Sequence, residues 1–140
     1  MRSGNAIRCG IVIKPDRTLE LWNATAKVGS ASSALSLNQW YRVELKFDAT
    51  GSGATDVLDA LIDGTSFASS STQSLFGVTT AVFGLYNGSV TGTPEWYFDD
   101  LAINDNTGSF QNTYAGEGEI IHLRPNAAGD NAAWAAGTGT

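Results

Sequence analysis

The stretch that determines the fold class is Tyr41-Arg42-Val43-Glu44-Leu45-Lys46-Phe47-Asp48, where apolar residues hold the odd positions and charged residues the even ones. This period of two is typical of a β-strand, because successive side chains on a strand point to opposite faces of the sheet. The pattern predicts a strand with Val43, Leu45 and Phe47 in a core. The charges on its other face alternate in sign, and we expect them to form a solvated surface.

The segments before and after this stretch predict more strands. Residues 7–22 alternate in the same way around a turn signal at Pro15-Asp16 and indicate a hairpin. Residues 56–63 also fit one face of a short helix, but the hairpin turn signal at Asp63-Gly64 and the neighbouring strands favour a strand.

Three weaker patterns predict further strands around residues 35–37 and over residues 79–86 and 96–103. The apolar positions of the last segment change parity at Asp99-Asp100. One extra residue there would restore a single buried face, so the sequence predicts a β-bulge.

The composition indicates one β-rich domain. The chain has 140 residues, which suits a single domain, and its 42% of hydrophobic residues is too high for a disordered chain. Glycine, serine and threonine make up almost a third of the chain, which excludes a helical bundle. We therefore predict an all-β fold, an antiparallel β-sandwich with a less regular C-terminal tail.

Charge and cysteine content exclude several classes of protein. The net charge of −6 argues against a nucleic-acid partner, which requires a basic surface. No apolar run is long enough for membrane insertion. The single Cys9 cannot form a disulfide within the chain, and no Cys/His cluster has the spacing of a zinc site.

Three segments resemble, in order, parts of the laminin-G-like, concanavalin A-like jelly-roll family. They are the strand with the Trp-Tyr-x-Val pattern at 38–48, the strand and turn at 60–64, and the closing strand at 96–103. The resemblance implies a jelly-roll domain over residues 1–108, with Trp40 and Trp96 packed in its core. That family carries further strands before the position of Ile7, which leaves open whether this jelly roll has all of its first strands.

The C-terminal tail resembles, more narrowly, the segment that follows this jelly roll in bacteriophage virion proteins. The resemblance rests on Asp105-Asn106-Thr107-Gly108-Ser109, Gly116-Glu117-Gly118-Glu119, Leu123-Arg124-Pro125 and Trp134. Residues 109–140 then form a C-terminal extension that associates with other copies of the chain or with other virion proteins. Four residues too apolar to prefer water would carry this association: Ile120, Ile121, Leu123 and Trp134.

The sequence predicts no catalytic residues. Glycanases of this fold use paired carboxylates on one strand, and the pair that shares a face here, Glu44 and Asp48, has Lys46 between its members. Arg42-Val43-Glu44-Leu45 matches a stretch of jelly-roll alginate lyases, but those enzymes also need a His and Tyr acid/base pair. The one histidine, His122, lies in the tail. We therefore expect the chain not to be an enzyme.

No motif is specific for a metal, and calcium is the one cofactor that the sequence leaves open. Asp99, Asp100 and Asp105 could supply oxygen ligands for calcium, which laminin-G-type domains sometimes bind. Aspartate is also an ordinary turn residue, and the run lacks the dense spacing of an EF-hand.

Two pairs of residues indicate a sugar site. Trp22 precedes Asn23, and Tyr86 precedes Asn87, so an aromatic ring stands beside an amide at two strand ends. Sugar sites combine such a ring with directed hydrogen bonds. A ring that caps the core beside an asparagine in a turn gives the same pattern.

The leading hypothesis is a non-catalytic jelly-roll module of a phage virion that serves assembly, capsid or tail decoration, or surface attachment. The alternatives are a free-standing carbohydrate-binding module and, third, a glycan lyase or hydrolase. The phage-like tail favours the first over the second, and the missing acid/base pair disfavours the third. We expect the protein in a virion or outside the cell, with other copies of itself, other virion proteins or cell-surface glycans as partners.

Overall fold

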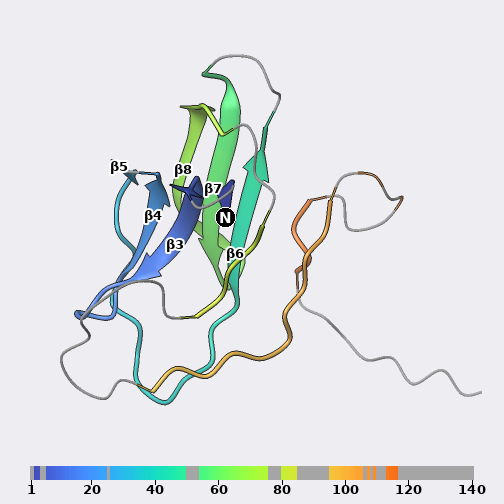
Figure 1. Ribbon diagram of the computed structural model, residues 1–140. Coiled ribbons are helices and arrows are strands. Elements are labelled where there is room, and N and C mark those ends of the chain that lie inside the picture. The colour runs from blue at the N-terminus through green and yellow to red at the C-terminus, as the bar shows by residue number, and fades with distance from the viewer. Residues whose placement is uncertain are drawn as a thin grey trace, which may run out of the picture.

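The computed structural model describes residues 2–3, 6–24, 26–49, 54–75, 80–84, 95–105, 107, 109 and 113–116 (Figure 1). These residues contain eight strands: β1 (Arg2–Ser3), β2 (Ala6–Ile7), β3 (Cys9–Ile13), β4 (Leu19–Asn23), β5 (Ala26–Val28), β6 (Val43–Asp48), β7 (Asp56–Ile62) and β8 (Thr65–Gln73). Strands β3-β4-β5 form one three-stranded sheet and β6-β7-β8 form another, and all neighbours are antiparallel. The short strands β1 and β2 pair with each other. The all-β prediction is confirmed as two antiparallel sheets, with no helix among the described residues.

The first sheet is built on the predicted hairpin. β3 and β4 pair along their whole lengths, and the turn between them lies at Pro15-Asp16, as predicted. The Asp16 carboxylate accepts hydrogen bonds at Oδ1 from Thr18 N (3.0 Å) and Thr18 Oγ1 (2.7 Å), which hold the turn closed. The first strand of the hairpin begins at Cys9, and Ile7 belongs to β2 instead.

The second sheet depends on the tight turn at Asp63-Gly64. Both residues have positive φ, 49° and 78°, as the two-residue type I′ hairpin turn requires. Asp63 also contacts Arg42, the residue before β6, since Asp63 N donates to Arg42 O (2.8 Å) and Asp63 Oδ1 accepts from Arg42 N (2.8 Å). The strand prediction for residues 56–63 is confirmed, and the helix alternative is excluded.

The core lies between the two sheets. It contains Cys9, Leu21 and Val28 from the first sheet, Leu58, Ala60 and Ala68 from the second, and Leu75 after β8. The sheets approach each other closely at Gly29, where an added Cβ would lie 3.2 Å from the Ala68 Cβ. Because Gly29 also has a φ of +66°, any side chain at this position would be strained and would push the sheets apart.

Strand β6 departs from the predicted burial pattern. Val43 is exposed, while Leu45 and Phe47 are half-buried against the core. On the opposite face, Glu44 and Lys46 are half-buried, not fully solvated as predicted. β6 is an edge strand, so its inner face is incompletely covered, and another part of the chain lies over its charged face.

Three predicted strands do not form in the described residues. They are the segments around residues 35–37, over 80–84 (the described part of 79–86, with one bridge residue) and over 96–103. A period-two sequence becomes a strand only where a neighbour pairs with its backbone. Within the described part of the chain no strand pairs with residues 96–103, so the β-bulge predicted at Asp99-Asp100 does not form there. Trp40 (68% exposed) and Trp96 (46% exposed) lie at the surface, so their assignment to the core is wrong.

The core predicts a large cost for one substitution. Leu58→Ala is expected to lower the free energy of unfolding by about 2–5 kcal/mol, because this side chain is fully buried between the sheets. Leu37→Ala, the same substitution at a side chain that is 72% exposed, is the matched control and should cost less than about 0.5 kcal/mol. Urea unfolding followed by circular dichroism measures both, and equal losses would contradict this core.

Candidate functional site

The outer face of the first sheet places a tryptophan among charged side chains. On β4, Leu19 and Leu21 point into the core, so the alternation turns Glu20 and Trp22 outward. Trp22 stands between Lys27 on β5 and Gly10 on β3, which has no side chain to cover the ring. We define the Trp22 face by its six residues: Gly10, Val12, Lys14, Glu20, Trp22 and Lys27.

One carboxylate organises the Trp22 face. Glu20 Oε2 accepts a hydrogen bond from Trp22 Nε1 (2.9 Å) and lies 3.8 Å from Lys14 Nζ, and Glu20 Oε1 lies 3.8 Å from Lys27 Nζ. The two lysine side chains are 41% and 43% exposed, against 14% for Glu20. Each ammonium therefore has N–H donors directed to solvent beside an aromatic ring. Such a surface can bind a carboxylate, a sugar ring or the acidic side chains of a protein.

The neighbouring Asn23 belongs to the opposite side of β4. Its Nδ2 donates a hydrogen bond to Gln73 Oε1 of β8, and Gln73 Nε2 donates in turn to Ser70 Oγ (2.7 Å). A sugar stacked on Trp22 would not reach this amide, so the structure does not bring Trp22 and Asn23 together in one site. The second predicted pair, Tyr86 and Asn87, lies outside the described residues.

The calcium candidates are separate turn residues. Asp99 Oδ1 accepts a hydrogen bond from Asp100 N (2.9 Å), and Asp105 Oδ1 accepts from Thr107 N (3.0 Å) and Thr107 Oγ1 (2.6 Å). The bonds from Thr107 hold the pKa of Asp105 below its usual range. Among the residues with described positions, no three Asp, Glu, His or Cys side chains cluster as metal ligands would.

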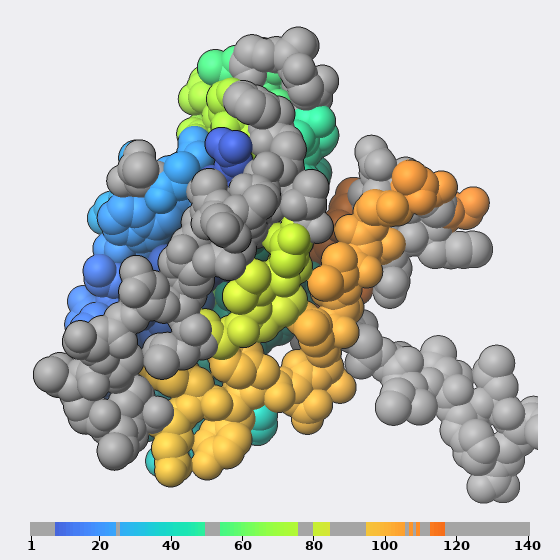
Figure 2. Space-filling model, in the orientation of Figure 1, coloured from blue at the N-terminus to red at the C-terminus, as the bar shows by residue number. Residues whose placement is uncertain are grey.

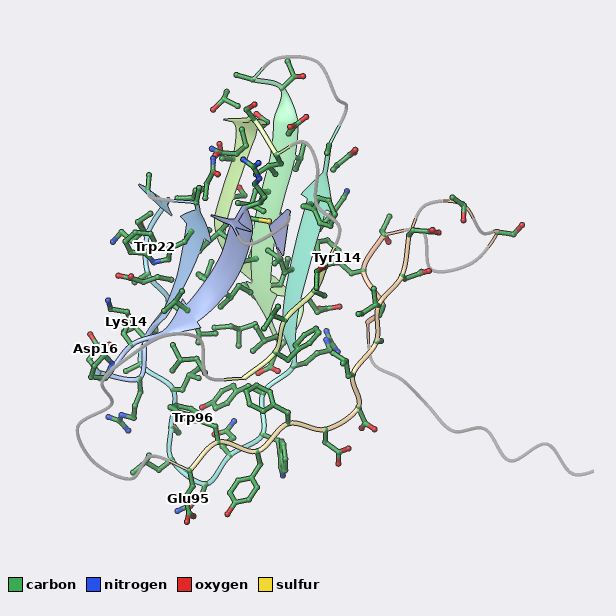
Figure 3. All side chains as sticks on the ribbon, viewed as in Figure 1. Lys14, Asp16, Trp22, Glu95, Trp96 and Tyr114 are labelled. Atoms are coloured by element: carbon green, nitrogen blue, oxygen red, sulfur yellow. The ribbon has the colours of Figure 1, made fainter. Side chains whose placement is uncertain are left out.

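A short strap, residues 114–116, covers the charged face of the second sheet. The Tyr114 hydroxyl donates to Asp59 Oδ2, and Gly116 N donates to Glu44 Oε1 (2.9 Å). The Lys46 Nζ lies 6.0 Å from the centre of the Tyr114 ring. Figure 3 shows Tyr114 beside β6, far from Trp22.

Sequence reasoning missed this strap. Residues 109–140 were assigned to association with other molecules, yet residues 114–116 contact the chain's own sheet. The available signal was the pair of aromatic residues, Phe110 and Tyr114, in the polar stretch around them. The four predicted association residues, Ile120, Ile121, Leu123 and Trp134, lie outside the described part of the chain, as does His122.

An exposed aromatic segment lies at the lower end of the molecule. Residues 95–105, which we call the acidic segment, run along the surface of the space-filling view (Figure 2). Five large apolar side chains of this segment are between 46% and 73% exposed: Trp96, Tyr97, Phe98, Leu101 and Ile103. The segment also carries Glu95, Asp99, Asp100 and Asp105 and no basic residue.

A cleft of about 330 Å³ lies between the irregular segment 32–41 and the β7-β8 hairpin. Its walls are apolar at Leu35, Ile62 and Phe67, with hydroxyl groups at Tyr41 and Thr65. The Tyr41 hydroxyl already accepts a hydrogen bond from Ser36 N (2.8 Å). The cleft holds no charged side chain, so it offers less chemical selectivity than the Trp22 face.

The strap predicts an alkaline loss of stability. Burial, and then the bond to Asp59, raises the pKa of Tyr114 above its usual value near 10. The unfolded chain releases this proton near pH 10 and the folded chain holds it, so the contribution of Tyr114 is complete below pH 10 and is lost as the pH rises. Urea midpoints between pH 8 and pH 12 should fall more steeply for the wild type than for Tyr114→Phe.

The matched control for this measurement is Tyr97→Phe, which removes the hydroxyl of an exposed tyrosine. We expect its pH dependence to equal that of the wild type. If Tyr114→Phe also followed the wild type, the strap would contribute nothing to the folded state.

Comparison with known proteins adds no relative: the chain matches no family model, no curated protein and no solved structure. Within the described residues, no helix is long and apolar enough to cross a membrane.

Proposed function

We propose that the chain is a non-catalytic β-sandwich module of jelly-roll type that works by association within a bacteriophage virion. Its partners are other copies of itself or other virion proteins, in assembly, in capsid or tail decoration, or in surface attachment. The observation that carries this proposal is the exposure of five large apolar side chains within the acidic segment. The phage setting rests on the resemblance of the tail, and the jelly-roll type rests on the resemblance of residues 38–48, 60–64 and 96–103.

The energetics favour association through this segment. Burying a fully exposed large apolar side chain gains about 1.5–3 kcal/mol, so these five, which are between 46% and 73% exposed, could together gain about 5–9 kcal/mol. Association costs about 4–15 kcal/mol in lost freedom before any contact is made. A partner that covers the whole segment can therefore offset this cost, and a monomer leaves the apolar side chains in water.

The contacts of the acidic side chains support a binding role over a catalytic one. Glu44 accepts hydrogen bonds from Gly116 N (2.9 Å) and Arg42 Nε (3.1 Å). Asp59 accepts from Tyr114 and from Ser66 Oγ (2.6 Å). Both carboxylates are engaged by the strap and the sheet, an arrangement that suits structural anchors.

Light scattering on the full chain tests the association. We expect the wild type to form an assembly whose mass is a multiple of the 14.7 kDa chain mass. Trp96→Ser/Phe98→Ser should be monomeric, while Trp40→Ser, which removes a more exposed tryptophan outside the segment, should assemble normally. A wild type that stays monomeric at high concentration would refute association between copies of this chain through the acidic segment.

The Trp22 face supports a second candidate function, carbohydrate binding. The Trp22 ring lies beside Gly10 and two lysines, as a sugar platform would require. Affinity electrophoresis against neutral and acidic polysaccharides should then show retardation that Trp22→Ala abolishes and Trp40→Ala preserves. Equal retardation of these two variants would exclude a sugar site on this face. A wild type that is not retarded by any polysaccharide would exclude it as well.

A further inference from the structure

We propose that the partner is a second copy of this chain, held head-to-tail, with the acidic segment of one copy docked on the Trp22 face of the next. This inference rests on the proposed association and names the surface that completes it. It is carried by the charge and the apolar content of two surfaces that lie apart on one molecule.

The charges of the chain are unequally distributed. Residues 1–27 hold five basic and two acidic residues, a net charge of +3, while residues 28–140 hold three basic and twelve acidic residues, a net charge of −9. The acidic segment contributes four carboxylates and no cation. On the Trp22 face itself, Lys14 and Lys27 against Glu20 leave a net charge of +1, so this face of one copy and the acidic segment of another attract each other.

The two surfaces also match in their apolar parts. The Trp22 face presents the partly exposed Trp22 ring, the space beside Gly10 and the exposed Val12. The acidic segment presents Tyr97 and Phe98, both largely exposed. Aromatic rings that stack on Trp22 would bring the neighbouring carboxylates to the N–H donors of the lysines.

The geometry directs this contact between copies. Figure 3 shows Lys14 and Trp22 on the left of the molecule and Glu95 and Trp96 at its lower end, so the two surfaces lie at different places on the molecule. A contact between two different surfaces is heterologous. It leaves one surface free at each end of a pair, so further copies add until the assembly closes into a ring or continues as a filament. A symmetric contact of segment on segment would instead oppose eight carboxylates, which repel one another.

Two charge-reversal variants test the inference. Lys14→Glu/Lys27→Glu disables the Trp22 face and leaves the acidic segment intact. Glu95→Lys/Asp99→Lys disables the acidic segment and leaves the Trp22 face intact. Each variant alone should be monomeric by light scattering. An equal mixture should form dimers and nothing larger, because one intact surface of each kind remains. Asp48→Lys, an exposed acid at the end of β6 outside both surfaces, is the matched control and should assemble as the wild type does.

The outcomes separate the two proposals. A monomeric wild type refutes the association itself, and with it the head-to-tail contact. If the wild type assembles and Lys14→Glu/Lys27→Glu assembles too, the association stands and the head-to-tail contact is refuted. A mixture of the two variants that fails to form dimers also refutes this contact. Circular dichroism checks that each variant folds, and Lys14→Gln/Lys27→Gln replaces the charge reversal if it does not.

Salt provides a measurement that needs no variant. We expect the dissociation constant of the wild-type assembly to rise at least about tenfold between 0.05 M and 1 M sodium chloride, because salt screens charges at an exposed interface. An affinity that is constant or increases with salt would indicate a purely apolar contact and would overturn the proposed docking. Soluble oligogalacturonate, an anionic competitor for Lys14 and Lys27, should dissociate the assembly at low salt if these lysines form the contact.

Discussion

The packing of two inner sheet faces against each other is the constraint on which the rest of the structure depends. Since side chains alternate along a strand, burial of Leu21 turns Trp22 to the outside of the first sheet. Burial of Ala60 likewise turns Asp59 to the outside of the second sheet, where the strap contacts it. The Trp22 face and the surface under the strap are thus both set by which alternate residues of each strand are apolar.

The sequence predicts those elements whose structure is determined locally. The hairpin around Pro15-Asp16 and the turn at Asp63-Gly64 each need only a few neighbouring residues, and both form where predicted. Residues 96–103 have an equally clear apolar pattern, yet among the residues that the structure describes no strand pairs with them. A pattern reveals that a segment has an apolar face, but not whether the same chain supplies the cover.

The candidate site was predictable in part, for the same reason. Trp22 and Asn23 are adjacent in sequence and suggest a joint site, but a strand sends adjacent side chains to opposite faces, and Asn23 bonds to Gln73. Glu20, Lys14 and Lys27 join Trp22 only through the register of three strands. The strap is harder still, because 55 residues separate Tyr114 from Asp59. Nothing in the alternating charges of β6 indicates that a distant tyrosine lies over them.

The position of Cys9 has a consequence for how the sandwich opens. This one thiol of the chain is completely buried between the sheets, and burial raises its pKa. A thiol reacts as an accessible thiolate, so Cys9 is protected while the two sheets remain together. Fraying of an outer loop leaves it covered, whereas detachment of β3 from β4 or separation of the two sheets exposes it. The rate at which a thiol reagent labels the native chain therefore reports the opening of the core around β3, in the free chain and in an assembly alike.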